Sequence, residues 1–410
     1  MARGGLFAAI DIGTTKICTI VGRPTETDVI EITGVGIVPS RGLLKGMVVD
    51  MEEATEAIRT SVQRAERTSG SRILSAHVGI TGNHVSSLNN KGMITITRSD
   101  RLVSEEDVTR VLEAARATVG VPTNREIIHV VPRSYTLDEQ EGVRNPIGLQ
   151  GFRLDVEAHI ITGAVNSIQN LARCVEQAGV QIDNLVLEPL ASGEAALRED
   201  EMETGAVLVD IGGGTTDLAI FTQGSVGFTS VIPVGGYQFT QDLVIGLRTP
   251  YVAAEAAKIA QGSVEPSSIP IDELTELSAY GTEDKRQVSR RLMAEILRAR
   301  LEDLLIIIQG VIRQSGYQGL LPAGIVFTGG SAKLPGMVEV TEQVLGIPAR
   351  IGTPSGIVGL VDALYDPAYA TSVGLLLWAM RYGQDESDGA QGSAVSEFLQ
   401  QIMSMFGRRG

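Results

Sequence analysis

Two segments that lie far apart in this chain carry nearly the same sequence. Residues 7–16 read FAAIDIGTTK, and residues 207–217 read VLVDIGGGTTD. Each is an apolar run that ends in Asp-Ile-Gly, continues with small and hydroxyl residues, and leads into another apolar run. This pattern is typical of a β-hairpin whose tight turn directs backbone N–H groups towards an anion. Two such turns, each with an Asp at the end of a strand, indicate a duplicated, two-lobed protein that grips a phosphate chain and its metal from both sides.

The composition restricts the class of protein. A chain of 410 residues is long enough for two or three domain-sized units. Its net charge of −15 argues against nucleic acid as the main partner, because neutralising phosphates needs a basic surface. Two cysteines argue against a disulfide framework, and the four histidines lack the spacing of a zinc site. No apolar run is long enough to span a membrane and no secretory signal precedes the first motif, so we expect the chain to stay in the cytoplasm.

Periodic apolar residues predict an α/β fold. Three strands are expected over residues 6–38, a helix over 50–68 and a strand over 73–80. The second copy, from near residue 185, repeats the order of strand, turn and two further strands. Three more expected features are a small α/β unit at 85–162 with a capping box at Ser104, a helix at 165–178, and a mostly helical stretch at 237–310 whose charged helix starts near 284.

Residues 327–336, FTGGSAKLPG, supply a third element in the second half of the chain. A strand leads to a glycine pair and then to the start of a helix. Glycines at this place would let a planar base or a ribose lie against the backbone. A plain strand-to-helix turn would explain these residues on their own, but the three elements in this order favour a nucleotide site.

The three elements resemble the phosphate-1, phosphate-2 and adenosine motifs of the actin, heat-shock-70 and hexokinase superfamily. Residues 188–196 (EPLASGEAA) and 371–379 (TSVGLLLWA) resemble the two helices that connect its lobes. With the insert at 85–162 and an amphipathic end, residues 6–407 as a whole resemble the FtsA family of actin-like cell-division proteins. The resemblance implies an actin-like two-lobed ATPase fold with duplicated β-sheet subdomains. It also implies ATP and Mg²⁺ as cofactors, with at most slow hydrolysis.

The resemblance also implies how the chain is divided. The expected units are a lobe 1 core (1–84, 163–190 and 366–383), an inserted subdomain (85–162), a lobe 2 core (191–239 and 311–365), a helical subdomain (240–310), a linker (384–393) and a membrane-targeting helix (394–410).

By the same resemblance, Asp11 and Asp210 hold Mg²⁺ through waters. Carboxylates suit a hard cation, and N–H groups and a lysine suit phosphate oxygens. The residues expected at the nucleotide are Gly13, Thr14, Thr15 and Lys16 of the first turn; Gly212, Gly213, Gly214, Thr215 and Thr216 of the second; Gly235 and Gly236 beside the ribose; Glu255 and Lys258 beside the adenine; and Gly329, Gly330, Ser331 and Lys333 of the third motif.

Glu188 heads the first connecting helix and has two interpretations. By resemblance to heat-shock-70 proteins it would orient the water that attacks the nucleotide, which places it with Asp11 and Asp210 as a catalytic candidate. Alternatively, it is a carboxylate at a helix N-terminus that is stabilised by the helix dipole. The two interpretations differ over hydrolysis but not over ATP binding.

The end of the chain predicts a helix that lies on a membrane surface. At 100° per residue, its apolar residues fall in one sector and its polar residues in the other. An acidic, Gly- and Ser-containing segment at 384–393 precedes the helix and favours a membrane contact over docking on the protein's own core, which remains the alternative. The residues expected at the membrane are Val395, Phe398, Leu399, Ile402, Met403, Met405, Phe406, Arg408 and Arg409.

The resemblance implies a polymer on the cytoplasmic side of the cell membrane at the division site. It would tether the tubulin-like FtsZ through its C-terminal peptide and recruit later division proteins. Among the basic residues at 285–298, Arg286 and Arg290 are candidates for the peptide's dock, although these charges would equally suit a solvated helix face. Two alternatives are a pilus-assembly actin-like protein and a small-molecule kinase of the same superfamily, for which we find no substrate-site motif.

Overall fold

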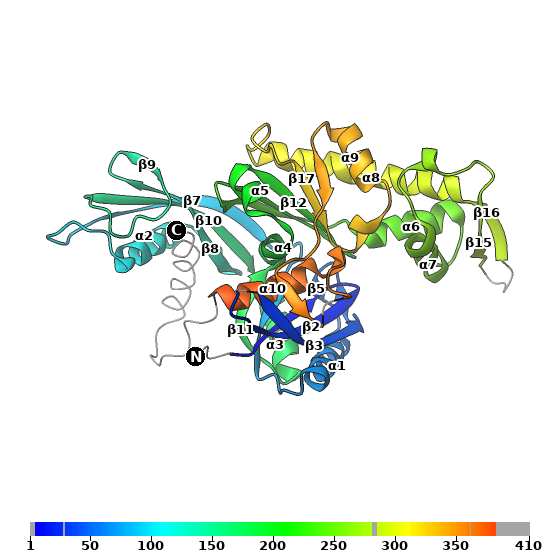
Figure 1. Ribbon diagram of the computed structural model, residues 1–410, viewed down its shortest axis with the longest axis horizontal. Coiled ribbons are helices and arrows are strands. Elements are labelled where there is room, and N and C mark those ends of the chain that lie inside the picture. Colours follow the sequence, from blue (N-terminus) through cyan, green and yellow to red (C-terminus); the bar gives the residue numbers. More distant parts are fainter. Residues whose placement is uncertain (1–4, 28, 281–284, 361, 383–410) are drawn as a thin grey trace.

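A computed structural model describes residues 5–27, 29–280, 285–360 and 362–382 (Figure 1). The predicted linker at 384–393 and the predicted membrane helix at 394–410 lie outside the described residues. The described part contains three larger sheets and two hairpins.

The first half of the chain builds lobe 1 around a six-stranded sheet with the order β11-β6-β1-β2-β3-β19. Strands β1, β2 and β3 run antiparallel, whereas β6, β11 and β19 each run parallel to the strand they join. The bounds of these strands are β1 (Phe7–Ile12), β2 (Lys16–Pro24), β3 (Ile30–Pro39), β6 (Ser75–Ile80), β11 (Gln181–Leu187) and β19 (Ile357–Gly359).

Two helices and a small hairpin complete lobe 1. Helix α1 (Met51–Ser69) begins where the Asp50 side chain accepts a hydrogen bond from the Glu53 N–H and ends at Gly70, which is left-handed. It packs on the sheet together with α3 (Val165–Gln177), through buried side chains such as Ile58 and Leu171. The predicted strands and both predicted helices are therefore confirmed. The hairpin β4 (Leu43–Leu44) and β5 (Met47–Val48) was not expected.

Lobe 2 repeats the topology of lobe 1. Its five-stranded sheet has the order β14-β13-β12-β17-β18, with three antiparallel strands followed by two parallel ones. The duplication expected from the two similar segments is thus visible in the strand pairing. The bounds are β12 (Ala206–Ile211), β13 (Thr216–Thr222), β14 (Ser225–Ile232), β17 (Ile325–Thr328) and β18 (Ala349–Ile351), and α9 (Met337–Leu345) follows β17.

The insert is a four-stranded antiparallel sheet, β7-β10-β8-β9, with one helix on it. The Ser104 side chain accepts from the Asp107 N–H at the start of α2, so the expected capping box is present. The insert extends from lobe 1 and lies beside β14 of lobe 2 (Figure 1). His159 contributes to this contact, because its Nε2 lies 2.9 Å from the Thr229 hydroxyl. The bounds are β7 (Ser86–Thr95), α2 (Glu105–Ala117), β8 (Arg125–Leu137), β9 (Gln140–Val143) and β10 (Arg153–Ala164).

The predicted helical subdomain differs from the expectation at one place. Residues 285–289 form strand β16, which pairs with β15, and the long helix α8 begins only at Arg290, after a Ser289 cap. The predicted charged helix from about 284 is therefore wrong over its first residues. Helix α8 also continues past residue 310 and packs along lobe 2, so both regions share one hydrophobic core. The bounds are α6 (Gly236–Leu247), α7 (Tyr251–Gln261), β15 (Leu274–Ser278), β16 (Lys285–Ser289) and α8 (Arg290–Gln314).

Helices α4 (Glu188–Ala196) and α10 (Ala370–Tyr382) cross between the lobes at the centre of Figure 1. They cross so closely that a Cβ atom at Gly374 would lie 1.8 Å from the Ala191 carbonyl oxygen. Both are buried, and a short α5 (Glu199–Thr204) links α4 to lobe 2. The chain also returns to lobe 1 earlier than expected, because β19 joins the lobe 1 sheet although 311–365 was assigned to lobe 2.

Candidate functional site

The two similar segments form two hairpin turns with the same geometry. In lobe 1 the turn between β1 and β2 is closed by a hydrogen bond from the Gly13 N–H to the Lys16 carbonyl, 3.1 Å long. In lobe 2 the turn between β12 and β13 is closed by the Gly212 N–H and the Thr215 carbonyl at 2.9 Å. We call them turn 1 (residues 13–16) and turn 2 (residues 212–215).

The two turns face each other across the lobe interface and touch. A Cβ atom added at Gly213 would lie 2.2 Å from Thr15 Cγ2, and one at Gly214 would lie 2.8 Å from Thr14 Oγ1. The glycines of turn 2 therefore leave the space that the threonines of turn 1 occupy. The structure thus brings together the residues that the sequence predicted as two halves of one phosphate site.

The aspartates that precede the turns are buried and held by hydroxyl groups of the connecting helices. The Ser372 hydroxyl donates to Asp11 at 2.6 Å. Asp210 accepts from Ser192 at 2.7 Å and from Thr371 at 3.0 Å. Burial raises the pKa of Asp11 and of Asp210 in spite of these hydrogen bonds, because the interior disfavours their charged forms.

Two further carboxyl groups lie in the same region. Burial raises the pKa of Glu188 well above its usual value, and the charges of Asp11, Asp217 and Asp210 raise it further. Burial and the neighbouring negative charges therefore outweigh any stabilisation of the Glu188 carboxylate by the dipole of helix α4. Burial also raises the pKa of Asp217 to about 7, although Asp217 accepts a hydrogen bond from Thr81 of lobe 1.

Lys16 is the cation among these carboxyl groups. Its Nζ donates to the Ala368 carbonyl at 2.5 Å and lies 5.0 Å from the ring centre of Tyr369. Burial alone would lower the pKa of Lys16, but the charges of Asp11, Cys18, Asp210 and Tyr369 together outweigh burial and the pKa is raised. Lys16 therefore stays charged and offsets only part of the acidic charge.

The residues predicted beside the base and ribose gather on lobe 2. A Cβ atom at Gly236 would lie 2.8 Å from Ser331 Oγ and 3.5 Å from Lys258 Nζ. Gly329 is left-handed, and a Cβ atom there would lie 2.4 Å from Asp210 Oδ1, so the third motif directly adjoins turn 2. Gly235 is in contact with the backbone of turn 2 in the same way.

Three charged residues of this group are paired. Lys258 Nζ lies 2.9 Å from Glu255 and 2.8 Å from the Thr240 hydroxyl, on adjacent helices α6 and α7. Lys333 pairs with Asp366, a residue that caps the short helical turn before α10. Next to Lys333 in sequence, Gly330 makes no close contact in the space where a side chain would lie.

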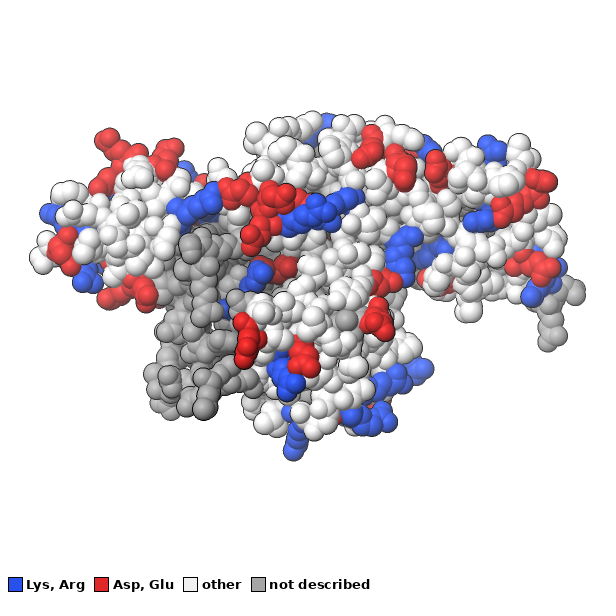
Figure 2. Space-filling view, viewed as in Figure 1, with Lys and Arg blue, Asp and Glu red and all other residues white. Residues whose placement is uncertain are grey.

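The basic residues predicted for a partner peptide do not share one helix face. Arg286 lies in strand β16, whereas Arg290 opens α8, where it pairs with Glu273 and donates to the Gln261 carbonyl at 3.1 Å. The Arg286 Nε is buried and lacks a hydrogen-bond partner among the described residues. On the face in Figure 2, acidic and basic side chains are interspersed.

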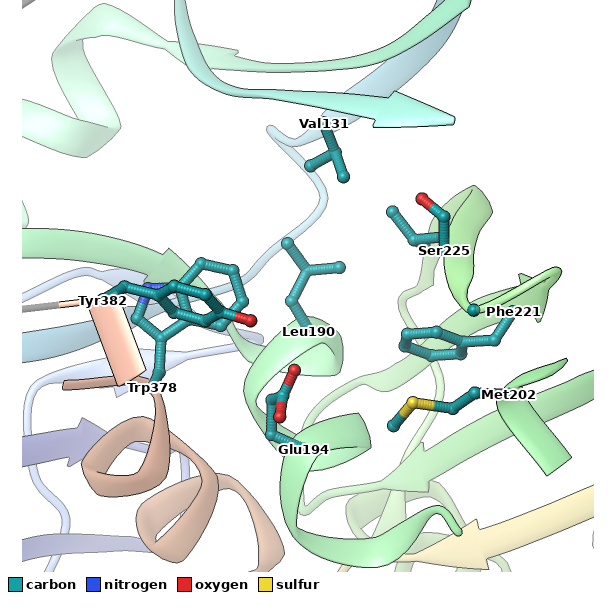
Figure 3. Close-up of a pocket in the computed structure, with 10 residues that line it drawn as sticks. Val131, Leu190, Glu194, Met202, Phe221, Ser225, Trp378 and Tyr382 are labelled. Atoms are coloured by element: carbon teal, nitrogen blue, oxygen red, sulfur yellow. The ribbon is translucent and has the colours of Figure 1, made fainter. Parts of the chain in front are cut away.

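A separate pocket of about 50 Å³ lies behind α4, between the insert, α10 and lobe 2 (Figure 3). Leu190 and Glu194 of α4 and Trp378 of α10 line it, opposite Phe221 of lobe 2. Its lining contains no residue predicted to bind the nucleotide. The pocket therefore belongs to the hinge region and not to the phosphate site.

Two absences within the described residues concern metals and membranes. Within them, no three His, Cys, Asp or Glu side chains gather closely enough to hold a metal ion by themselves. None of the helices that the structure describes has the length and apolar character needed to cross a membrane.

Several functional candidates were missed at the sequence level. Thr81, Ser192, Thr371 and Ser372 all donate to carboxylates of the site, from three different elements. The hydroxyl pair at the head of the second connecting helix was a usable signal for the last two. Thr81 carried no signal, because its contact with Asp217 depends on how the two lobes meet.

Two related sheets, two connecting helices and paired turns define this protein as a member of the actin-like class of two-lobed nucleotide-binding folds. Solved structures agree on the fold. A PilM–PilN type IV pilus biogenesis complex matches with a TM-score of 0.66 at 16% identity, covering 90% of this chain and 97% of that one. MreB5 of Spiroplasma citri bound to ADP matches with a TM-score of 0.57 at 14% identity, covering 94% and 99%.

Sequence comparison gives the family. A model described as "Cell division protein FtsA" matches residues 207–374, and one described as "SHS2 domain inserted in FTSA" matches residues 82–162. Cell division protein FtsA of Pseudomonas aeruginosa is 42% identical over 94% of this chain and 91% of its own length. The relative of the same description in Bacillus subtilis is 37% identical over 98% and 90%. The chain belongs to the FtsA family of cell-division proteins.

Proposed function

We propose that this chain binds Mg²⁺ and ATP between its lobes and polymerises on the inner face of the cytoplasmic membrane at the division site. There it tethers the FtsZ ring through the FtsZ C-terminal peptide and recruits later division proteins. The observation that carries the nucleotide part is that two equivalent turns, one from each lobe, meet with a buried aspartate behind each. Membership of the FtsA family supports the cell-division part.

The residues present suit Mg²⁺ and a phosphate chain. Burial raises the pKa values of the Asp11 and Asp210 carboxyl groups, and positive charge nearby would favour their charged forms. A divalent cation would supply that charge, and Mg²⁺ commonly keeps several waters and takes one or two carboxylates. The glycines of turn 2 let backbone N–H groups approach phosphate oxygens, and Lys16 adds a charged donor. The bound metal would neutralise the phosphate charge and polarise the terminal phosphate.

The group on lobe 2 suits the nucleoside. Gly236 lies against two polar side chains, those of Ser331 and Lys258. Glu255 holds Lys258 in place. We assign the ribose to the Gly235–Gly236 side and the adenine to the side of Glu255 and Lys258.

Glu188 is our candidate for orienting the attacking water. Burial and the neighbouring carboxylates raise the pKa of Glu188, so its charged form is disfavoured until a cation nearby favours it. We therefore expect hydrolysis to be slow and to depend steeply on Mg²⁺. Replacing Glu188 with Gln should abolish hydrolysis and leave ATP affinity within about twofold, since the amide is close in size to the protonated carboxyl.

The membrane part of the proposal rests on the sequence of residues 394–410. Partial burial of its apolar side chains stabilises each contact by less than the roughly 1.5–3 kcal/mol of full burial. Its two arginines add roughly 1 kcal/mol each at an anionic surface. One tail therefore binds weakly, whereas tails on a polymer bind together through their effective concentration.

Arg286 and Arg290 are the proposed dock of the FtsZ peptide. The pairing of Arg290 with Glu273 means that an acidic peptide would have to compete with an existing ion pair. Replacing both arginines with Glu should weaken binding of the peptide in a fluorescence anisotropy titration. Unchanged affinity would exclude this dock.

The first experiment is liposome co-sedimentation with and without Mg-ATP, comparing the intact chain with one that ends at Gln391. Pelleting that needs the tail and strengthens with ATP would support a membrane-bound polymer. Equal and negligible pelleting of both chains would mean that the apolar stripe packs on the protein itself. The pilus-type alternative is less favoured, because its structural relative is 16% identical whereas the FtsA relatives reach 42%. Strong stimulation of ATP consumption by a small-molecule acceptor would support the kinase alternative.

A further inference from the structure

The β4–β5 hairpin of lobe 1 has a tip that the phosphate and adenosine motifs do not include. Its two tip residues are Lys45 and Gly46, and both are left-handed, with φ values of 49° and 75°. This conformation is ordinary for glycine but uncommon for lysine. Residues with such uncommon backbone conformations cluster at binding sites, and Lys45 lies at a contact between the lobes.

The tip lies against both turns. The Gly46 N–H donates to the Thr14 hydroxyl of turn 1 at 3.2 Å. A Cβ atom added at Gly214 of turn 2 would lie 3.0 Å from the Lys45 Cα. On its other side, Gly46 is packed against Gly82, next to the Thr81 that bonds to Asp217. Three separate segments, two from lobe 1 and one from lobe 2, therefore meet at the tip formed by Lys45 and Gly46.

The charge of Lys45 is not used by the described part of the protein. Lys45 is half-buried, and no ion pair within the described residues includes it. Lys16, the lysine of turn 1, is already engaged by the Ala368 carbonyl and by the field of Asp11. Lys45 is therefore more available than Lys16 to bind an added anion.

The position of Lys45 along the site follows from the contacts of turn 2. Gly236 and Ser331, which we assign to the nucleoside, lie on one side of the turn, and Gly235 packs on the backbone of Gly212, Gly213 and Thr215. Lys45 and Thr14 instead contact Gly214, at the tip of turn 2 that meets turn 1. A phosphate chain that runs over turn 2 from the nucleoside would therefore reach Lys45 at its far end.

We propose that Lys45 binds the terminal phosphate of a nucleoside triphosphate and so makes the site prefer a triphosphate to a diphosphate. This inference rests on the proposed nucleotide site. The hairpin tip places half-buried Lys45 where turn 1 and turn 2 meet, and a diphosphate would end before it. Because the tip touches both lobes, contact with the third phosphate would also hold the lobes together.

The test compares ATP and ADP affinities of the full-length protein by isothermal titration calorimetry with Mg²⁺ present. Lys45→Met should weaken ATP binding about tenfold or more, as expected for loss of a charge-assisted contact, and change ADP binding by less than about twofold. Lys45→Arg should keep most of the preference for ATP. Lys91→Met, on strand β7 of the insert, is the matched control and should change neither affinity.

Lys45→Gly separates the side chain from the backbone, because glycine adopts the left-handed conformation without strain. If the ammonium group binds phosphate, this variant should lose ATP affinity as Lys45→Met does. ATP affinity that survives in Lys45→Gly, or equal losses for ATP and ADP in Lys45→Met, would overturn the proposal. Absence of nucleotide binding by the unmodified protein would instead refute the proposed function itself.

Discussion

Turn 1 and turn 2 have the same length and the same closing hydrogen bond, yet they use different chemistry. Strand pairing makes Asp11 equivalent to Asp210, Lys16 equivalent to Thr215, and Cys18 equivalent to Asp217. Turn 1 therefore presents two threonines and a lysine, whereas turn 2 presents three successive glycines and a threonine. One turn contributes side chains, and the other contributes accessible backbone.

The difference shows how two copies of the same turn pack against each other. Thr14 and Thr15 occupy the space that Gly214 and Gly213 leave, so the turns interdigitate. Two turns rich in side chains would collide, and two turns of glycine would leave the interface loosely packed. The interface between the two turns can therefore close because turn 1 and turn 2 differ in sequence.

Lys16→Met should give the largest effect, because it removes the cation from turn 1. We expect about a 100-fold loss of ATP affinity and a loss of about 3 kcal/mol in the free energy of unfolding, since buried carboxylates lose a partner. Thr215→Val at the equivalent position of turn 2 should change both much less. Calorimetric titration and urea denaturation measure the two effects. Similar losses in both variants would contradict a division between a charged turn and a backbone turn.

Gly213→Ala should push the turns apart. The added Cβ would lie 2.2 Å from Thr15 Cγ2, and such overpacking costs about 1–3 kcal/mol. We expect about a tenfold loss of ATP affinity in the same titration. Thr15→Ser removes that methyl group, so the double variant should recover most of the loss. Failure of the double variant to recover would mean that the turns do not meet as described.

Asp217→Asn should change how stability depends on pH. Between the ordinary pKa of 3.8 and its raised value of about 7, the folded protein keeps a proton on Asp217 that the unfolded chain has released. The free energy of unfolding therefore falls as the pH rises through this window, by up to about 1.4 kcal/mol per pH unit. Asp217→Asn should flatten this fall in nucleotide-free protein. Cys18→Ser, at the equivalent position of lobe 1, should leave the fall unchanged, because burial raises the pKa of Cys18 to about 12.

Thr81→Val should give the smallest effect. It removes one hydrogen bond to Asp217 across the lobe interface, which is worth about 1 kcal/mol. Urea denaturation of the nucleotide-free protein measures the loss, and Thr60→Val on α1, whose hydroxyl donates to the Glu56 carbonyl of the same helix, serves as a control. A loss no larger than that of the control would mean that Thr81 does not help hold the lobes together.

The sequence predicted most of the fold because the strands and helices of both lobes have clear apolar periods. It did not predict β15–β16, since KRQVS is a short, charged run whose pairing depends on a distant partner strand. The position of β19 depends likewise on a parallel neighbour far away in the chain.

The candidate site was predictable where a motif carries its chemistry. Asp11, Asp210 and the glycines of turn 2 could be predicted in this way. The partners of the aspartates and the hairpin tip at Lys45 were not, because these contacts arise when separate elements pack together. Contacts of this kind have no local pattern, so only the folded structure reveals them.

The first turn of helix α10 is hydrogen-bonded to both lobes. The Ser372 hydroxyl donates to Asp11 of lobe 1, and the Thr371 hydroxyl donates to Asp210 of lobe 2. The helix is a rigid rod of 13 residues, about 20 Å long. If α10 tilts as a rigid body about the two carboxylates, its far end moves most. A tilt of about ten degrees would displace that end by about 3 Å. That end is Tyr382, the last described residue, so a small movement at the two carboxylates would be magnified there.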